Sequence, residues 1–177
     1  MKNYQRIKQK LWQGIAPNVI LLGLVSLITD VSSEIIHPLL PMFIVALGGG
    51  GLAVGLIGGL GDSLASILKV FAGFWSDKSG KRKPFVFSGY ALSSLCKIFL
   101  AFSTVWQHIL ILKPAERVGK GLRTAPRDAI IADSSIDQRG KAFGLHRAMD
   151  TAGAIGGSSL AFLLFYFLGF SLSLIHI

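Results

Sequence analysis

The sequence has few charged residues for its 177-residue length and a single cysteine. Charged side chains make up 15% of the residues and hydrophobic ones 51%, a balance that argues against an ordinary soluble domain. Because Cys96 has no second cysteine in the sequence, an internal disulfide and a cysteine metal cluster are excluded. The G-x-x-x-x-G-K-[ST] order of a nucleotide-binding loop does not occur, nor do H-E-x-x-H and G-x-S-x-G. We therefore expect no metal, no cofactor and no enzyme activity.

Long apolar runs separated by short polar connections are what the sequence does contain. A helix needs about 20 apolar residues to cross a bilayer. On that basis we predict five spans, over residues 18–47, 52–75, 85–105, 109–130 and 142–170, between tails at residues 1–17 and 171–177. The first span is longer than a bilayer requires, and we expect it to bend near Pro38 and Pro41. The predicted fold class is an all-α membrane protein with the lipid bilayer as its surroundings.

The net charge of +9 is distributed in a way that indicates membrane topology. Thirteen of the 18 Lys and Arg residues fall in the N-terminal tail, in residues 73–84 and in residues 123–147, and the other connections carry none. Cytoplasmic loops of membrane proteins carry an excess of Lys and Arg. The pattern predicts a multi-pass protein of the cell membrane, most simply a bacterial inner membrane, with its N-terminus in the cytoplasm. It also argues against a nucleic-acid partner.

The connection between the second and third predicted spans reads G-F-W-S-D-K-S-G-K-R-K-P. Gly73 leaves room for a neighbouring helix, and Gly80 permits a positive backbone angle in a short turn. Asp77 places a carboxylate at the membrane boundary. Lys81 and Arg82 can anchor the turn among anionic headgroups. A generic basic anchor would explain the cations but not the placing of the two glycines and the aspartate.

This connection resembles the signature loop of the major facilitator superfamily of secondary transporters, G-x-x-x-D-[RK]-x-G-[RK]-[RK]. The positions that match it are Gly73, Asp77, Lys78, Gly80, Lys81 and Arg82. The resemblance implies a bundle of twelve helices in two six-helix halves. We therefore interpret the chain as a truncated N-terminal half, with the missing C-terminal half of the same transporter as its partner.

A second basic stretch, A-D-S-S-I-D-Q-R-G-K-A-F-G, resembles another cytoplasmic signature of that family. By this resemblance, Asp133 and Arg139 are expected to exchange ion pairs with Asp77 and Lys81 as the helices rock, which would close an inner gate in one state. The alternative is a set of solvated loop charges that contribute little.

Charged residues inside the spans are candidates for solute and proton binding, since each costs roughly 3 kcal/mol near mid-bilayer. Asp30, Glu34 and His37 are spaced by four and three residues and so share one helix face. Such a face could pass protons or hold a cation, or could be a structural polar seam. From a rise of about 1.5 Å per residue, Asp150 and Asp62 lie at a similar depth to Asp30, ~12 to 18 Å from the start of their spans.

Arg117 lies in the same layer and, with Gly121, matches the R-x-x-x-G pattern of the family's fourth helix. The resemblance implies a role in solute or proton coupling, with Asp30 and Asp150 as candidate partners, whereas Glu116 is expected to point away. A fixed ion pair between two helices is the alternative. Three further cations are interpreted as continuing the stripe of Arg117, either as a funnel for anions or as an inner anchor: Lys120, Arg123 and Arg127.

Glycines at four-residue spacing predict two close helix contacts, at Gly55 and Gly59 and at Gly153 and Gly157. The second pair begins like a G-x-x-x-G-P-x-x-G-G pattern of the antiporter branch, but Ser158 replaces its proline. This departure weakens an assignment to proton-driven drug export.

Together these features predict secondary active transport of a small solute by alternating access, coupled to protons through Asp30 or Glu34. We expect the 177-residue piece to be inactive alone, because one wall of the cavity would be missing. Two alternatives belong to other classes. One is a membrane sensor or interaction protein on a transporter scaffold, and the other is an intramembrane enzyme.

Overall fold

The computed structural model describes residues 15–167, and all the regular secondary structure in that range is helical. The helices are α2 (Pro17–Ile36), α3 (Leu40–Ala46), α4 (Gly51–Ser79), α5 (Arg82–Leu100), α6 (Trp106–Ser134) and α7 (Arg139–Phe167), with a 3-10 turn η1 (Ile136–Gln138) before α7. The predicted C-terminal tail, the end of the fifth span and most of the N-terminal tail lie outside the described residues.

The single span predicted over residues 18–47 is divided in the structure into α2 and α3, separated by a turn. Pro38 lies in that turn and Pro41 lies in the first turn of α3. A proline has no N–H to continue a helix, and its ring collides with the carbonyl group four residues earlier. The two prolines therefore interrupt the helix where the sequence led us to expect a bend.

The other helices differ from the predicted spans at their ends. α4, α6 and α7 extend beyond the apolar runs into polar residues, such as Lys78, Asp133 and Arg139, which hydropathy alone leaves out. α5 instead ends at Leu100, before the predicted boundary. By length and composition alone, α2, α4 and the segment Ile136–Phe167 could cross a membrane. α6 falls short on composition because it carries a row of charged residues.

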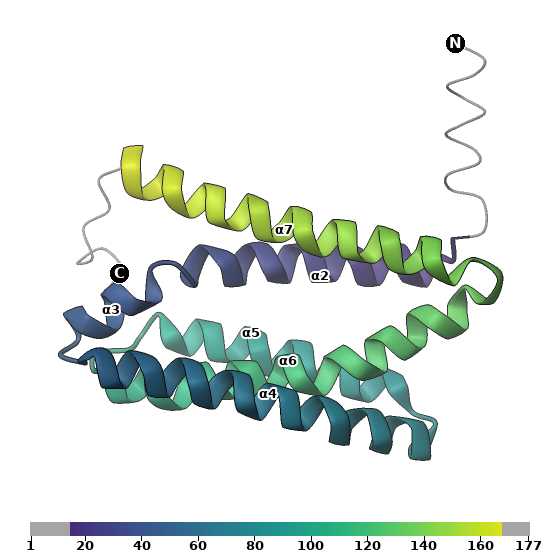
Figure 1. Cartoon of the computed structure of the whole chain (residues 1–177), viewed down its shortest axis with the longest axis horizontal. Helices are drawn as coiled ribbons and strands as arrows, with labels where there is room; N and C mark the ends of the chain where they lie inside the picture. Colours follow the sequence, from purple (N-terminus) through teal and green to yellow (C-terminus); the bar gives the residue numbers. More distant parts are fainter. Residues whose placement is uncertain (1–14, 168–177) are drawn as a thin grey trace, which may run out of the picture.

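The helices form two groups, which Figure 1 shows one above the other. α2 and α7 lie side by side along their lengths, and α6 packs against both α4 and α5. The contacts between α6 and the α2–α7 pair are far fewer. The start of α2, the α4–α5 connection and the α6–α7 connection lie at the same end of the molecule, so the basic connections share one end (Figure 1).

Glycines set the close crossings within each group. A Cβ at Gly153 would lie 2.6 Å from the carbonyl oxygen of Leu27, and one at Gly157 would lie 2.6 Å from that of Val31. Backbones this close can be reached only where one partner has no side chain. Gly153 and Gly157 thus let α7 lie directly on α2.

In the other group, the glycines that make close contacts differ from those singled out in the sequence. Cβ atoms at Gly89 and Gly119 would each lie 2.6 Å from the other residue's carbonyl oxygen, where α5 crosses α6. Gly121 lies equally close to α4. At Gly55 and Gly59, by contrast, a Cβ would meet no atom within 4 Å in the described part of the chain. The contact expected there is therefore not made by these helices.

Two apolar clusters join the helix groups at opposite ends. One, on α3, α4, α5 and α6, contains Phe43, Ile44, Ala53, Ile57, Leu100 and Ile109. The other is smaller and joins α2, α6 and α7 through Val19, Ile131 and Ala142. Between these clusters the facing surfaces are polar. Large apolar side chains on the outside of the helices are exposed, as expected for a surface that faces lipid.

Candidate functional site

A charged cavity of about 280 Å³ lies between α2, α6 and α7, between the two apolar clusters. Its lining consists of Asp30, Glu34, Lys120, Arg123, Thr124, Arg127, Arg147, Asp150, Thr151 and Ala154. Four of these residues are cationic and three are acidic. Charges are costly inside a membrane unless they face water, each other or a ligand. The concentration of charge in one cavity makes it the candidate site.

The cationic wall of the cavity comes from one face of α6. Charged residues recur there at spacings of three and four, at Lys113, Glu116, Lys120, Arg123 and Arg127. A helix turns by about 100° per residue, so this spacing keeps all five on one side. The row runs from the buried pair of Lys113 and Glu116 through the cavity to the inner end of the helix.

Arg117 lies on a different face of α6 from the cavity. Its Nε lies 3.7 Å from an Asp62 carboxylate oxygen on α4, and the Asp62 side chain is 74% exposed. The partners expected for Arg117, Asp30 and Asp150, instead line the cavity with other cations. The expected partners were wrong because Arg117 was aligned with the cations that follow it, from which it is rotated around the helix. By the same rotation Glu116, which was expected to point away, faces α2.

A network of ion pairs surrounds Asp150 at the end of the cavity nearer the α6–α7 connection. Arg127 donates to the Ser26 hydroxyl at 3.0 Å and to Asp128 at 3.0 Å, and it lies 3.9 Å from Asp150. The Nδ1 atom of the buried His146 lies 3.5 Å from the same Asp150 oxygen. These contacts join α2, α6 and α7.

Arg147 extends this network from α7. Its guanidinium lies 3.7 Å from Asp128 on α6 and 3.7 Å from Asp150 on its own helix. Both acids of the network are thus shared between two arginines, and the ion pairs Arg127–Asp150 and Arg147–Asp128 cross between the helix groups. Ionic contacts between two packed groups can be exchanged for others when the groups move.

At the centre of the cavity, by contrast, the charged side chains of the described residues form no direct ion pairs. Arg123 is 3% exposed and donates to the Ser93 hydroxyl at 3.0 Å, and its guanidinium carbon lies 4.3 Å from the centre of the Tyr90 ring. No carboxylate of a described residue lies within 4 Å of it. Asp30 and Glu34 likewise form no ion pair within 4 Å in residues 15–167.

Above the cavity, towards α3, the two helix groups are joined by hydrogen bonds to α2. Lys113 and Glu116 are both buried and lie 2.6 Å apart, and the Ser33 hydroxyl lies 3.5 Å from the Glu116 carboxylate. The Lys97 ammonium donates to the backbone carbonyl of Thr29 at 3.0 Å. These contacts hold the two helix groups together on the α3 side of the cavity, as the arginine network does on the side of the α6–α7 connection.

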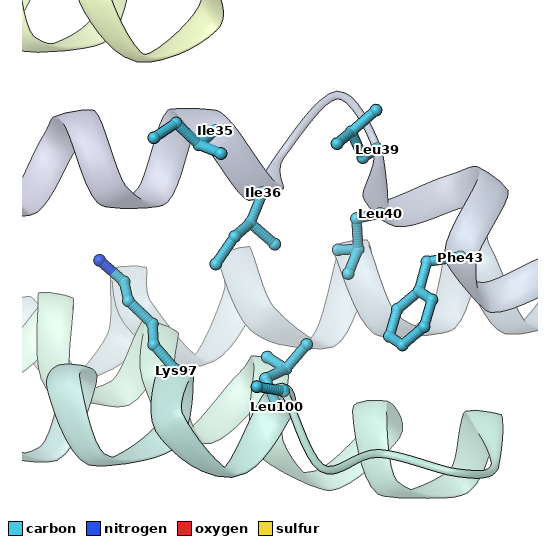
Figure 2. A pocket seen from close by; sticks show the side chains of 8 residues that line it. Ile35, Ile36, Leu39, Leu40, Phe43, Lys97 and Leu100 are labelled. Carbon is cyan, nitrogen blue, oxygen red and sulfur yellow. The ribbon is translucent and has the colours of Figure 1, made fainter. Parts of the chain in front are cut away.

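Figure 2 shows the apolar pocket that lies beside the contact of Lys97 with α2. Its walls are Ile35, Ile36, Leu39, Leu40, Phe43, Lys97, Leu100 and Ala101, from α2, α3 and α5 and their adjoining turns. Lys97 lies at one end of the pocket, with its ammonium directed towards α2 (Figure 2). Lys97 thus holds α5 to α2.

At the α4–α5 connection, Arg82 is the residue that joins three helices. It contacts Asp77 at 3.1 Å on α4, bonds to Asp133 on α6, and donates to the Ala129 carbonyl at 3.2 Å. Gly80 has a φ of 64° and ends α4, as expected for a tight turn. A Cβ at Gly73 would lie 3.3 Å from the Ala125 Cβ on α6.

Lys81 and Arg139, which the resemblance led us to expect in ion pairs, form none among the described residues. The pairing expected of Lys81 is made by Arg82, its immediate neighbour. Arg82 is the first residue of α5, and the helix start directs its side chain back towards the end of α6. His37, which was placed on the Asp30 face, lies exposed in the turn after α2.

Five residues at or beside the cavity were not identified as candidates from the sequence: Tyr90, Ser93, Asp128, His146 and Arg147. The spacing of the α6 row was a signal that could have oriented Arg123 and Arg127 correctly. No comparable pattern marks Tyr90 or Ser93, whose contact with α6 depends on where α5 crosses it. Among the described residues, no group of three or more His, Cys, Asp or Glu is arranged to hold a metal ion.

The fold and the cavity define an α-helical membrane protein with a charged site between two helix groups. Comparison with known proteins assigns it to a family, since a sequence model of the Major Facilitator Superfamily matches residues 22–175. The chain belongs to the major facilitator superfamily.

Among curated relatives, an uncharacterized MFS-type transporter of Methanocaldococcus jannaschii is 50% identical over 157 residues, which cover 89% of this chain and 39% of that protein. Uncharacterized proteins of Mycobacterium bovis and Mycobacterium tuberculosis are each 31% identical over 140 residues, covering 78% of this chain and 34% of theirs. The chain thus spans less than two fifths of the length of these relatives.

Proposed function

We propose that this chain is the N-terminal part of a secondary transporter that moves a small solute across the cell membrane by alternating access. The observation that carries the proposal is the charged cavity between two helix groups that meet mainly at their ends. In this proposal, the polar contacts at the two ends of the cavity open in turn while the packed groups stay intact. The missing C-terminal half would complete the path for the solute.

Proton coupling is proposed to run through Asp30 or Glu34. Both line the cavity on α2 and lack a direct ion pair among the described residues. A carboxyl group free of fixed cations can take up and release a proton as the cavity opens to either side. Asp150 is held by Arg127 and Arg147, and we assign it to the contacts that close the cytoplasmic end of the cavity. Arg117 is a candidate for coupling by family resemblance only.

The inner gate is proposed to consist of the Arg82 contacts with Asp77 and Asp133, with the basic connections in the cytoplasm. Because both acids are more than half exposed, these contacts stabilise the fold little and can be broken at low cost. In the opposite state, Lys81 and Arg139 would take over the pairing. Gly73 and Gly80 would allow the α4–α5 connection to follow the movement.

The test measures proton flux in vesicles that contain the complete reading frame to which this chain belongs. Vesicles loaded with a pH-sensitive dye are challenged in turn with a panel of amino acids, sugars and organic acids. We expect at least one solute to move protons, and Asp30→Asn to abolish that movement. Asp137→Asn, at an exposed acid of η1, is the matched control and should leave it unchanged.

Two outcomes would contradict this proposal. Ligand-induced thermal stabilisation without flux of any solute would favour the sensor alternative, and equal flux in Asp30→Asn and Asp137→Asn would remove Asp30 from coupling. The 177-residue chain alone should give no flux, since it is proposed to be only one half of the transporter.

A further inference from the structure

Arg123 is the most demanding charged group in the cavity. Its guanidinium is 3% exposed, it uses one hydrogen bond to Ser93, and it has no carboxylate of a described residue within 4 Å. A guanidinium presents five N–H donors and cannot give up its proton in a protein. Its remaining N–H groups have no acceptor among the described residues and are available to a ligand in the cavity that Arg123 lines.

A second donor without an acceptor lies beside Arg123. The Tyr90 ring lies 4.3 Å beneath the guanidinium, and its buried hydroxyl has no hydrogen-bond partner in residues 15–167. Buried polar groups nearly always have a partner. Lys120, one turn away from Arg123 on α6, lines the same cavity and forms no ion pair there with a described carboxylate.

The other cations of the cavity are accounted for. Arg127 and Arg147 share Asp128 and Asp150, and Arg127 also binds Ser26. The carboxylates on the opposite wall, Asp30 and Glu34, differ in kind from Arg123, because a carboxyl group can become neutral by binding a proton. Arg123 and Lys120 are therefore the cations of the cavity that lack a counter-charge in the described part of the chain.

We propose that the solute carried through this cavity is a small organic anion whose charged group binds between Arg123 and Lys120. This inference rests on the proposed transport function and adds the substrate class. Asp30 and Glu34 would repel such an anion unless they were protonated. The anion and a proton would then occupy the cavity together and move in the same direction.

The experiment uses methanethiosulfonate reagents that carry either a sulfonate or a trimethylammonium group on the same two-carbon chain. The sulfonate reagent is itself a small organic anion. Cys96, the lone cysteine of the chain, is replaced by alanine, and one threonine is changed to cysteine in the complete protein. Thr124 lines the cavity next to Arg123, and Thr104, exposed in the turn after α5, gives the matched control.

The quantity compared is the ratio of the sulfonate reagent's reaction rate to that of the ammonium reagent. We expect this ratio to be about tenfold higher at Thr124→Cys than at Thr104→Cys, since a charged cleft raises counter-ion concentration by that order. Arg123→Gln should bring the ratio close to that of Thr104→Cys. Arg123→Lys keeps the charge and should retain the preference, which controls for misfolding. Asp30→Asn should increase the preference further.

A ratio at Thr124→Cys equal to that at Thr104→Cys, or one that favours the ammonium reagent, would overturn the proposal. An unchanged ratio in a folded Arg123→Gln variant would do so as well. An anion preference in a protein that moves no solute in the vesicle assay would contradict transport while leaving the anion site standing. The two failures are therefore distinguishable.

Discussion

Replacing Gly157 by alanine tests the close contact of α7 with α2. The new Cβ would lie 2.6 Å from the Val31 carbonyl oxygen and 2.9 Å from the Glu34 Cβ. An ordinary contact begins at 3.4 Å, so the helices must separate locally by roughly 0.8 Å, the difference between 3.4 and 2.6 Å. Inserting an atom into a packed contact of this kind costs typically about 1–3 kcal/mol.

Gly156→Ala provides the matched control, because Gly156 precedes Gly157 on the same helix. A Cβ there would meet only the Val31 Cγ2 at 3.9 Å, an ordinary contact. Both substitutions gain the same preference of alanine over glycine in a helix, about 0.5–1 kcal/mol. That gain cancels in the comparison, and the difference between the variants isolates the contact.

The assay is reversible unfolding of the complete protein in mixed micelles, with the two variants measured in parallel. We expect Gly157→Ala to be less stable than Gly156→Ala by about 1–3 kcal/mol. Equal stability of the two variants, or a more stable Gly157→Ala, would refute the direct packing of α7 on α2.

Three further substitutions address the polar contacts. Glu116→Gln leaves the buried Lys113 without its partner at 2.6 Å and should lower the free energy of unfolding by about 3–5 kcal/mol in the same assay. The apolar double variant Lys113→Met with Glu116→Leu should recover most of that stability. Arg82→Gln removes exposed ion pairs and should change the free energy of unfolding by less than about 1 kcal/mol, while altering proton flux in vesicles. A large loss of stability without a change in flux would contradict a gate at this residue. Flux should fall further in Arg123→Gln than in Arg117→Gln, because only Arg123 lines the cavity, and the reverse order would return Arg117 to the site.

The helix positions could be predicted from the sequence because each helix contains an apolar run, and the break in the first span was marked by Pro38 and Pro41. The helix ends could not, since polar residues continue a helix without an apolar signal. The pairing of Gly153 with α2 followed a visible spacing. The contact of Gly89 with Gly119 did not, because it depends on the crossing point of two helices.

The candidate site shows the same division. Asp30, Glu34 and Asp150 were found because charge at depth in an apolar span is conspicuous, and the structure brings all three into one cavity. The orientation of Arg117 was wrong because a shift of one residue rotates a side chain by about 100° around the helix. The family pattern identified the residue but carried no information on which neighbour it faces.

Accessibility of the cavity from both sides of the membrane is the central requirement of this account. It can be measured by placing a cysteine at Ala154, which lines the cavity on α7, in the cysteine-free complete protein in sealed vesicles. A membrane-impermeant thiol reagent is then applied to one face at a time. Alternating access predicts labelling of Ala154→Cys from either face, and labelling from one face only, or from neither, would contradict it.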